Sequence, residues 1–99
     1  MLNLDDISVT HDEARQQFSL TIDGQVALIA YRRRPGLLSL DLTEVPRSIQ
    51  SQGVAAKLTR AALDFARAEN LRVVPACSYA VAFIREHAEY QDLVASGKG

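Results

Sequence analysis

The sequence has few of the residues that disulfide-bonded, metal-binding and nucleic-acid-binding proteins need. It contains one cysteine and two histidines among 99 residues, so it can form no disulfide within the chain and no zinc site built on paired cysteines. Aromatic residues make up only 6%, and 11 Lys and Arg against 12 Asp and Glu give a net charge of −1. This balance argues against a protein that neutralises a phosphate backbone. We therefore expect no metal site and no nucleic-acid partner.

Long apolar runs are also absent. The longest, Val26 to Tyr31, is far shorter than the roughly 20 residues of a membrane helix, so we expect no membrane partner. The first residues, Met1 to Asp6, lack the basic segment and apolar stretch of a signal peptide. Together with the single cysteine, this predicts a cytoplasmic protein. The length predicts one domain, residues 1–99, with a single modest core.

Apolar and polar residues alternate in the first half of the chain, which is the pattern of half-buried strands. We predict four strands, at residues 7–10, 16–22, 25–33 and 37–45. Asp23-Gly24 favours a two-residue hairpin, because both central residues of a type I′ turn need positive φ. Pro35-Gly36 marks the next turn, and Pro46 ends the last strand. The strands form an antiparallel meander, in which the run Arg32 to Arg34 reads as a protected, solvated strand edge.

The second half changes to a helical period. From Val54 the apolar residues recur on one face over about 16 residues, which predicts an amphipathic helix that stops near Asn70. A short buried strand at 71–75 and a second helix at 79–87 follow, and the tail from Ala95 onward is expected to fray. Four strands, a helix, a strand and a helix predict an α+β fold. Its last strand joins the sheet in parallel through a right-handed crossover.

The loop before the long helix has the features of an anion site. Gly53 and the small residues after it leave backbone N–H groups accessible at the positive end of a helix. An ordinary turn into a helix has the same features, so the spacing alone leaves both readings open.

Several motifs, in order, resemble one known family. Gln50-Ser51-Gln52-Gly53-Val54-Ala55 looks like the Gln/Arg-x-x-Gly-x-Gly/Ala pyrophosphate loop of the GCN5-related N-acetyltransferases, and as in that family it follows the fourth strand. Segments 42–46, 62–67, 73–79 and 87–90 are similar to the compact YjdJ-like subgroup of minimal acetyltransferases, which is known for a Cys and a Gly. The resemblance covers residues 7–94. It implies the acetyltransferase fold, with a mainly antiparallel five-stranded sheet and two helices, and acetyl-CoA-dependent transfer of an acetyl group to an amine.

The resemblance also implies where coenzyme A binds. In this fold the fourth and fifth strands splay apart, and the pantetheine arm lies in the gap, bonded to backbone groups around Thr43, Glu44 and Val45. The pyrophosphate takes N–H bonds from the loop that follows. The implied cofactor-binding residues are Thr43, Val45, Gln50, Ser51, Gln52, Gly53, Val54 and Ala55. Lys57, Arg60 and Arg85 are alternative partners for the 3′-phosphate, and the sequence does not choose among them.

Cys77 is a candidate catalytic residue, because the resemblance points the thioester toward the end of the fifth strand, where this residue lies. Its thiolate would accept the acetyl group, or its thiol would protonate or orient the departing sulfur. The other reading is a small hydrophobic residue, since cysteine is among the most buried residue types. No His or Lys adjoins it in sequence. Cys77-Ser78-Tyr79-Ala80 also echoes the Asn-x-x-Ala pattern of the family.

Glu44 is the remaining candidate for a general base, because attack on a thioester needs a neutral amine. The alternative is a solvated carboxylate at a strand end. Two departures from the family bear on the mechanism. Ile84 stands where many members have a Tyr that protonates the thiolate, and Leu42 stands where the compact subgroup usually has a His. Tyr79 lies nearby in sequence.

The chain has no room for the helices between the first two strands or for the final hairpin, which wall the acceptor site in longer relatives. We therefore expect a shallow, open acceptor groove that suits a protein lysine, a polyamine or a substrate supplied by a partner. The residues at positions 42 and 84 motivate a competing hypothesis, a non-catalytic coenzyme A-binding or protein-interaction module. His11, in a predicted turn, and His87, near a helix end, are expected to have structural roles.

Overall fold

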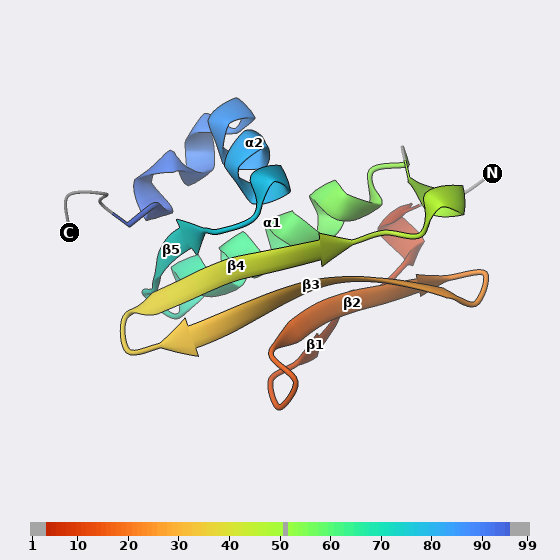
Figure 1. Ribbon diagram of the computed structural model, residues 1–99, viewed down its shortest axis with the longest axis horizontal. Helices are drawn as coiled ribbons and strands as arrows, with labels where there is room; N and C mark the ends of the chain where they lie inside the picture. The colour runs from red at the N-terminus through yellow and green to blue at the C-terminus, as the bar shows by residue number, and fades with distance from the viewer. Residues whose placement is uncertain (1–3, 51, 96–99) are drawn as a thin grey trace.

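The computed structural model (Figure 1) describes residues 4–50 and 52–95. The strands are β1 (Thr10–Asp12), β2 (Gln17–Ile22), β3 (Gln25–Arg34), β4 (Leu37–Glu44) and β5 (Arg72–Pro75), and the α-helices are α1 (Val54–Ala68) and α2 (Ser78–Glu86). Short 3₁₀ helices are η1 (Leu4–Asp6), η2 (Arg47–Ile49) and η3 (Ala88–Leu93). Ser51, one of the predicted binding residues, and the predicted frayed tail after Ala95 lie outside the described residues.

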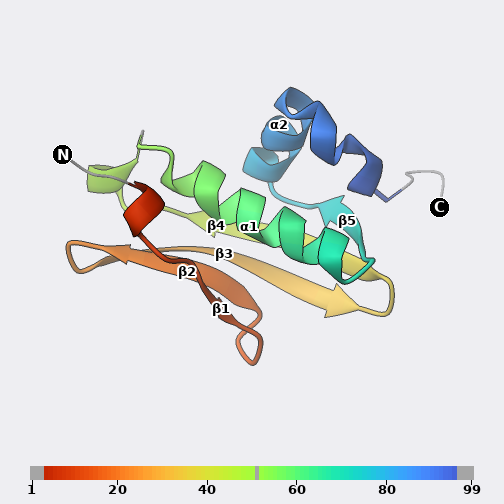
Figure 2. The same ribbon diagram turned by 180° about the vertical axis from the view of Figure 1, so that it is seen from behind.

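The five strands form one sheet in sequence order, β1-β2-β3-β4-β5. β1 to β4 pair antiparallel, and β5 returns through α1 to pair parallel with β4. α1 lies across one face of the sheet, and Figures 1 and 2 show this from opposite sides. The predicted α+β fold, the order of its elements and its parallel β4-β5 pair are confirmed.

The turn residues adopt the backbone conformations that the sequence predicts. Asp23 and Gly24 have φ of 51° and 77°, as a type I′ turn requires, and they join the paired residues Ile22 and Gln25. α1 ends at Ala68. Asn70 follows with a φ of 59°, so the predicted stop of the long helix is confirmed.

One apolar core fills the space between the sheet and α1. Apolar residues at every second position of β2 and β3 are buried on the face that α1 covers, as the period of a strand requires. The buried apolar face of α1 consists of Val54, Leu58, Ala62, Leu63 and Ala66. Within the described residues no helix covers the other face of the sheet, which we call the bare face (Figure 1). Val26 and Leu42 are 51% and 46% exposed on it.

The first strand lies later in the chain than predicted. Instead of residues 7–10, β1 comprises Thr10–Asp12, and Thr10 pairs with Ser19 of β2. The prediction was wrong because residues 4–9 leave the edge of β2 toward α1, where Leu4 lies against Gly53. The alternation seen in the sequence does place Ile7 and Val9 against the core, but without strand pairing.

The prediction that His11 lies in a turn was also wrong, because His11 belongs to β1. Its ring stacks on Phe18 with the centroids 4.0 Å apart, and its Nε2 lies 2.7 Å from the hydroxyl of Tyr31. Phe65 of α1 contacts the same ring edge-on. The predicted structural role fits these contacts, because His11 is a member of an aromatic cluster between the sheet and α1.

β4 contains a bulge that sets which side chains face α1. Ala30 of β3 pairs with Leu42, and the next residue of β3 pairs with Leu40, so Asp41 is the extra residue. Arg32 donates to the Asp41 carboxylate at 2.6 Å, and Ser39 donates to it as well. Burial opposes ionisation of Asp41, but these two hydrogen bonds outweigh it and lower the pKa of the carboxyl. They fix the bulge, which shifts the alternation by one residue.

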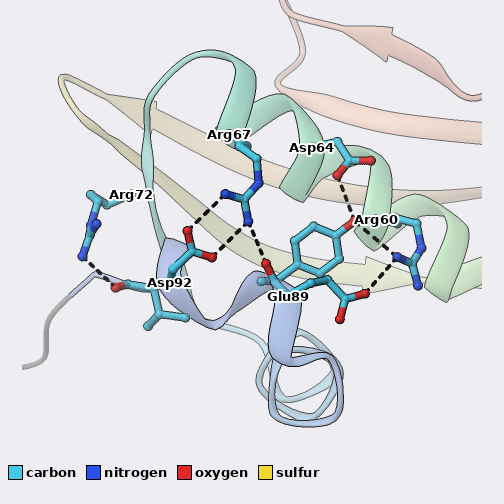
Figure 3. A network of polar contacts seen from close by, with 8 residues as sticks. Arg60, Asp64, Arg67, Arg72, Glu89 and Asp92 are labelled. Atoms are coloured by element: carbon cyan, nitrogen blue, oxygen red, sulfur yellow. Dashed lines mark hydrogen bonds and ion pairs between the residues drawn. The ribbon is translucent and has the colours of Figure 1, made fainter.

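η3, which the sequence analysis did not predict, is docked on α1 by polar contacts (Figure 3). Arg67 donates to both carboxylate oxygens of Asp92, at 3.1 and 3.0 Å, and to the backbone oxygen of Glu89 at 2.7 Å. The hydroxyl of Tyr90 donates to Asp64 at 2.8 Å. These contacts tie the segment after α2 to the outer side of α1, and so hold α2 beside β5.

Candidate functional site

The pairing between β4 and β5 ends halfway along β4. It runs from Leu37 with Arg72 to Leu40 with Pro75. The backbone N–H groups of Ala76 and Cys77 then both donate to the oxygen of Leu40, at 2.9 and 3.0 Å. β4 continues to Glu44, while the chain after β5 turns into α2. The predicted splay of the two strands is therefore present.

Two side chains meet across this gap. The hydroxyl oxygen of Thr43, on β4, lies 3.5 Å from the sulfur of Cys77, at hydrogen-bond distance for sulfur. Thr43 pairs with the buried Ile29 of β3, so the bulge at Asp41 turns its side chain toward the α1 side of the sheet. Without the extra residue, Leu42 would take that orientation. The contact between Thr43 and Cys77 thus depends on the bulge.

A hollow of about 320 Å³ opens beside Thr43, at the start of α1 and α2. It is lined by Thr43, Val45, Gln50, Ala55 and Tyr79. All of these except Tyr79 are predicted cofactor-binding residues, brought together from β4, from the loop after it and from α1. A hollow of this size lies in the range of small-molecule sites, which typically measure about 300–1,000 Å³.

The loop between η2 and α1 has the properties of an anion site. Gly53 is the N-terminal cap of α1 with a φ of 80°, a left-handed conformation that glycine adopts without strain. No side chain of the described residues caps this end of the helix. Its first N–H groups therefore remain for an anion, with the positive end of the helix dipole behind them. Val54 is 1% exposed, so it can contribute only backbone groups.

Two of the predicted loop residues play different parts. The side-chain amide of Gln50 donates to the backbone oxygen of Val45 at 2.9 Å, which fixes the loop against the end of β4. Gln52 is exposed and does not line the hollow. Gln50 thus shapes the hollow with its side chain, beyond the backbone role expected of it.

Cys77 is the N-terminal cap residue of α2, with extended backbone angles. Its side chain is half-buried and packs against the core. Among the described residues, its hydrogen-bond partner is the Thr43 hydroxyl, which is not a base at neutral pH. A nucleophilic thiol needs a nearby base, a cation or a helix N-terminus, and of these the described residues offer Cys77 the N-terminus of α2. Without a base beside it, Cys77 fits a thiol that orients or donates better than one that attacks.

Glu44 lies on the other face of the sheet. It pairs with Leu28 of β3, and neighbouring residues of a strand point to opposite faces, so its exposed side chain is on the bare face. It does not line the hollow with Thr43. The two candidate catalytic residues therefore lie on opposite faces of the sheet. Cys77 lies on the α1 side, where the hollow opens, and Glu44 lies on the bare face.

Ile84 and Leu42, the two residues that depart from the family pattern, both lie outside the hollow. Ile84 is 5% exposed and belongs to the core, so its position supplies no proton donor. Leu42 lies exposed on the bare face. Tyr79, in the first turn of α2, lines the hollow. Burial raises its pKa and the charge of Glu86 adds to this, so it keeps its proton at neutral pH.

The sequence alone assigns no role to Tyr79, which the structure places in the lining of the hollow. The signal that could have found it is its place two residues after Cys77, at the start of a helix whose first turn faces the gap. His87 has the expected structural role: its Nδ1 lies 2.7 Å from the backbone oxygen of Phe83, and the two rings stack at 3.9 Å.

No group of three or more His, Cys, Asp and Glu side chains in the described part of the chain could hold a metal ion. None of the helices there is long and apolar enough to cross a bilayer.

The chain is similar in sequence to one family of proteins. The family described as GCN5-related N-acetyl-transferase matches residues 17–93. Protein NATD1 of Bos taurus is 36% identical over 85 residues, which cover 82% of this chain and 74% of that protein. Protein NATD1 of Danio rerio is 34% identical over 103 residues, covering 94% and 93%.

A solved structure agrees with the sequence relatives. The NMR solution structure of a GCN5-like protein from Staphylococcus aureus, a candidate N-acetyltransferase, superposes with a TM-score of 0.71 and 28% sequence identity. The superposition covers 90% of this chain and 88% of that one. With the family match over residues 17–93, this shows that the chain belongs to the GCN5-related N-acetyltransferase family and has its fold in a compact form.

Proposed function

We propose that this protein is an acetyl-CoA-dependent N-acetyltransferase that transfers an acetyl group to a primary amine. The observation that carries the proposal is the hollow between β4 and the start of α2. It unites Thr43, Val45, Gln50 and Ala55 beside an α1 N-terminus that no described side chain caps. These are the groups that a long ligand with a pyrophosphate in its middle needs.

The residues present fit coenzyme A. β4 beyond Leu40 has no pairing with β5, so its outer edge is available to the amide groups of a pantetheine arm, much as to an added strand. The N–H groups at Gly53 to Ala55 would bind the pyrophosphate. The half-buried Val45 and Ala55 provide apolar surface between these two polar regions.

When bound, the acetyl thioester supplies an electrophilic carbonyl carbon, to which the amine nitrogen bonds as the C–S bond breaks and the sulfur takes up a proton. Thr43 and Cys77 lie in contact at the end of the splay and would orient the reacting thioester by hydrogen bonding. Tyr79 keeps its proton and lines the same hollow, so its hydroxyl is a second donor near the leaving sulfur.

The acceptor amine would approach over the bare face of the sheet. Glu44 is exposed there, and its carboxylate can take a proton from an ammonium group before attack. No helix of the described residues walls this face, which supports an open acceptor groove and an acceptor held on a larger molecule, such as a protein lysine or a polyamine.

A second candidate function is a coenzyme A-binding module without turnover. The buried Ile84 in place of the usual Tyr favours it, because that side chain cannot protonate a thiolate. The two functions share the ligand and differ in the release of free thiol.

Thermal unfolding with acetyl-CoA, together with a free-thiol assay, tests the proposal. A ligand at 100 times its dissociation constant stabilises a protein by about 2.7 kcal/mol, which raises the midpoint by about 10 °C or more for a domain of this size. We expect this shift, and we expect thiol release that depends on an added lysine peptide or polyamine. A shift without thiol release would favour the binding module. No shift at millimolar acetyl-CoA would contradict both.

A further inference from the structure

A smaller hollow, of about 160 Å³, opens on the bare face at the end of the sheet where β3 turns into β4 (Figure 1). Its lining comes from three neighbouring strands and consists of Arg32, Arg34, Leu37, Ser39 and Val74. Leu38 and Leu40 are buried under α1, so Leu37 and Ser39 point to the opposite face. We call this hollow the arginine hollow. The site proposed for acetyl-CoA uses none of its residues.

The arginine hollow carries more positive than negative charge. Arg32 donates to the Asp41 carboxylate at 2.6 Å, and Arg34 also acts electrostatically on that carboxylate. Two guanidinium groups therefore share one carboxylate. Arg34 is exposed, and within residues 4–50 and 52–95 no hydrogen bond or salt bridge engages its guanidinium. Its donors are available to a carboxylate from another molecule, which a guanidinium can bind through two hydrogen bonds.

The other end of the bare face is acidic and apolar. Glu44 is exposed there, where we propose that it takes the proton of the acceptor ammonium group. Leu28 pairs with Glu44 across β3 and β4, and Val26 and Leu42 are exposed on the same face. Such apolar surface suits the methylene chain of a lysine, whose charged end remains with a carboxylate. The bare face thus attracts a cation at one end and an anion at the other.

The distance between the two ends sets the kind of acceptor that fits both. Along β4, Glu44 follows Ser39 by five residues and Leu37 by seven. At about 3.3 Å per residue, with the bulge at Asp41 taking up one residue, the separation is about 13–20 Å. An extended peptide covers this distance with about four to six residues. A polyamine carries further ammonium groups along its length, which the arginine hollow would repel.

We propose that the acceptor is a protein segment with acidic side chains about four to six residues from the acetylated lysine, and that the arginine hollow binds their carboxylates. The inference rests on the proposed function, because it assumes that the lysine reacts beside Glu44. Arg34 supplies most of the attraction, since Arg32 is already bonded to Asp41. The hollow therefore selects among lysine acceptors without touching the reacting atoms.

Acetylation kinetics with short peptides test the inference. Each peptide has a blocked N-terminus and one lysine. Two acidic peptides carry a pair of Glu residues about five residues before or after the lysine, and the neutral peptides carry Gln instead. We expect KM to be about threefold to fivefold lower for at least one acidic peptide than for its neutral match, as for one exposed ion pair. The kcat values should be equal, because a contact far from the reacting carbon stabilises the bound substrate and the transition state alike.

Two variants and a third acidic peptide locate the contact. Arg34→Gln should give acidic and neutral peptides equal KM values. Arg15→Gln removes an exposed arginine in the turn between β1 and β2, which no hydrogen bond of the described residues joins to the hollow, and it should leave the preference intact. A peptide with its Glu pair directly beside the lysine has the same charge at the wrong spacing, so it should show no preference.

Several results would overturn the inference while the proposed function stands. These are equal KM values for acidic and neutral peptides in the unaltered protein, a preference that survives Arg34→Gln or is lost in Arg15→Gln, the same preference for the peptide with adjacent Glu residues, and acetylation of a polyamine but of no peptide. If neither peptides nor polyamines cause release of free thiol from acetyl-CoA, the proposed function fails, and this inference fails with it.

Discussion

The hydroxyl of Thr43 and the thiol of Cys77 lie 3.5 Å apart across the point where β4 and β5 stop pairing. Two separate features of the fold bring them together. The bulge at Asp41 turns Thr43 toward the α1 side, and the end of β5 leaves Cys77 at the start of α2. The contact therefore links the geometry of the sheet to the site that we propose for the thioester.

Replacing Cys77 separates an orienting thiol from a nucleophile. Cys77→Ser keeps a group that can hydrogen-bond Thr43, so we expect kcat within about threefold of the unaltered protein. Cys77→Ala removes that group, and we expect kcat to fall about tenfold, less than the roughly 100-fold or more that a full general acid supplies, with unchanged affinity for acetyl-CoA. Steady-state kinetics with binding measurements check both. An acetyl group found on Cys77 by mass spectrometry would instead establish a covalent intermediate.

Gly53→Ala should weaken both the fold and ligand binding. Its φ of 80° is strained for alanine, and the added Cβ would lie 3.2 Å from Leu4 Cδ1. The strain costs about 1–2 kcal/mol, measurable by urea unfolding. Gly24→Ala is the matched control, because Gly24 has a φ of 77° and open space around its Cβ position. It should cost similar stability but leave acetyl-CoA affinity unchanged. Equal losses of affinity in the two variants would argue against a ligand at the Gly53 loop.

Tyr90→Phe should destabilise the packing of η3 on α1. Tyr90 is 5% exposed, and its hydroxyl joins Asp64 and Arg60, which would both lose a partner. We expect a loss of about 1 kcal/mol in the free energy of unfolding, since both remaining groups can reach water. Tyr79→Phe, the control, removes a hydroxyl for which no described residue is a partner, and it should leave stability unchanged. A reversed order of effects would contradict the contacts of Figure 3.

Asp41→Asn should destabilise the protein in a manner that depends on pH. Hydrogen bonds from Arg32 and Ser39 lower the pKa of Asp41 below its ordinary value of 3.8. The carboxylate therefore contributes stability above that value and loses it as pH falls through the lower pKa of the folded state. We expect the difference in unfolding free energy between the two proteins to be constant from pH 5 to 7 and to shrink below about pH 4. A difference that grows toward low pH would contradict this assignment.

Local patterns predicted much of the fold because they depend on neighbouring residues. The alternation in residues 17–34 fixed the faces of β2 and β3, and Asp23-Gly24 specified the turn between them. The resemblance of the loop around Gly53 then indicated Thr43, Val45, Gln50 and Ala55 as binding residues, and the fold brings these four to one hollow.

The remaining features depend on contacts between distant residues. The bulge in β4 is stabilised by Arg32 of the neighbouring strand, so the sequence of β4 alone does not reveal it. The place of η3 depends on Arg67, which is 25 residues from Asp92 in the chain. β1 begins late because Leu4 packs against Gly53. Each of these contacts exists only after the sheet and α1 have come together.

The most direct test of the account is an NMR titration of the 15N-labelled protein with acetyl-CoA. We predict saturable shifts of the backbone amide signals of Val45, Gly53, Val54 and Ala55, which border the 320 Å³ hollow or the loop beside it. The amide signals of Asp23 and Gly24, in the distant hairpin turn, should not move. An absence of saturable shifts at millimolar acetyl-CoA, or shifts confined to residues of the bare face such as Val26 and Leu28, would contradict acetyl-CoA binding between β4 and α2.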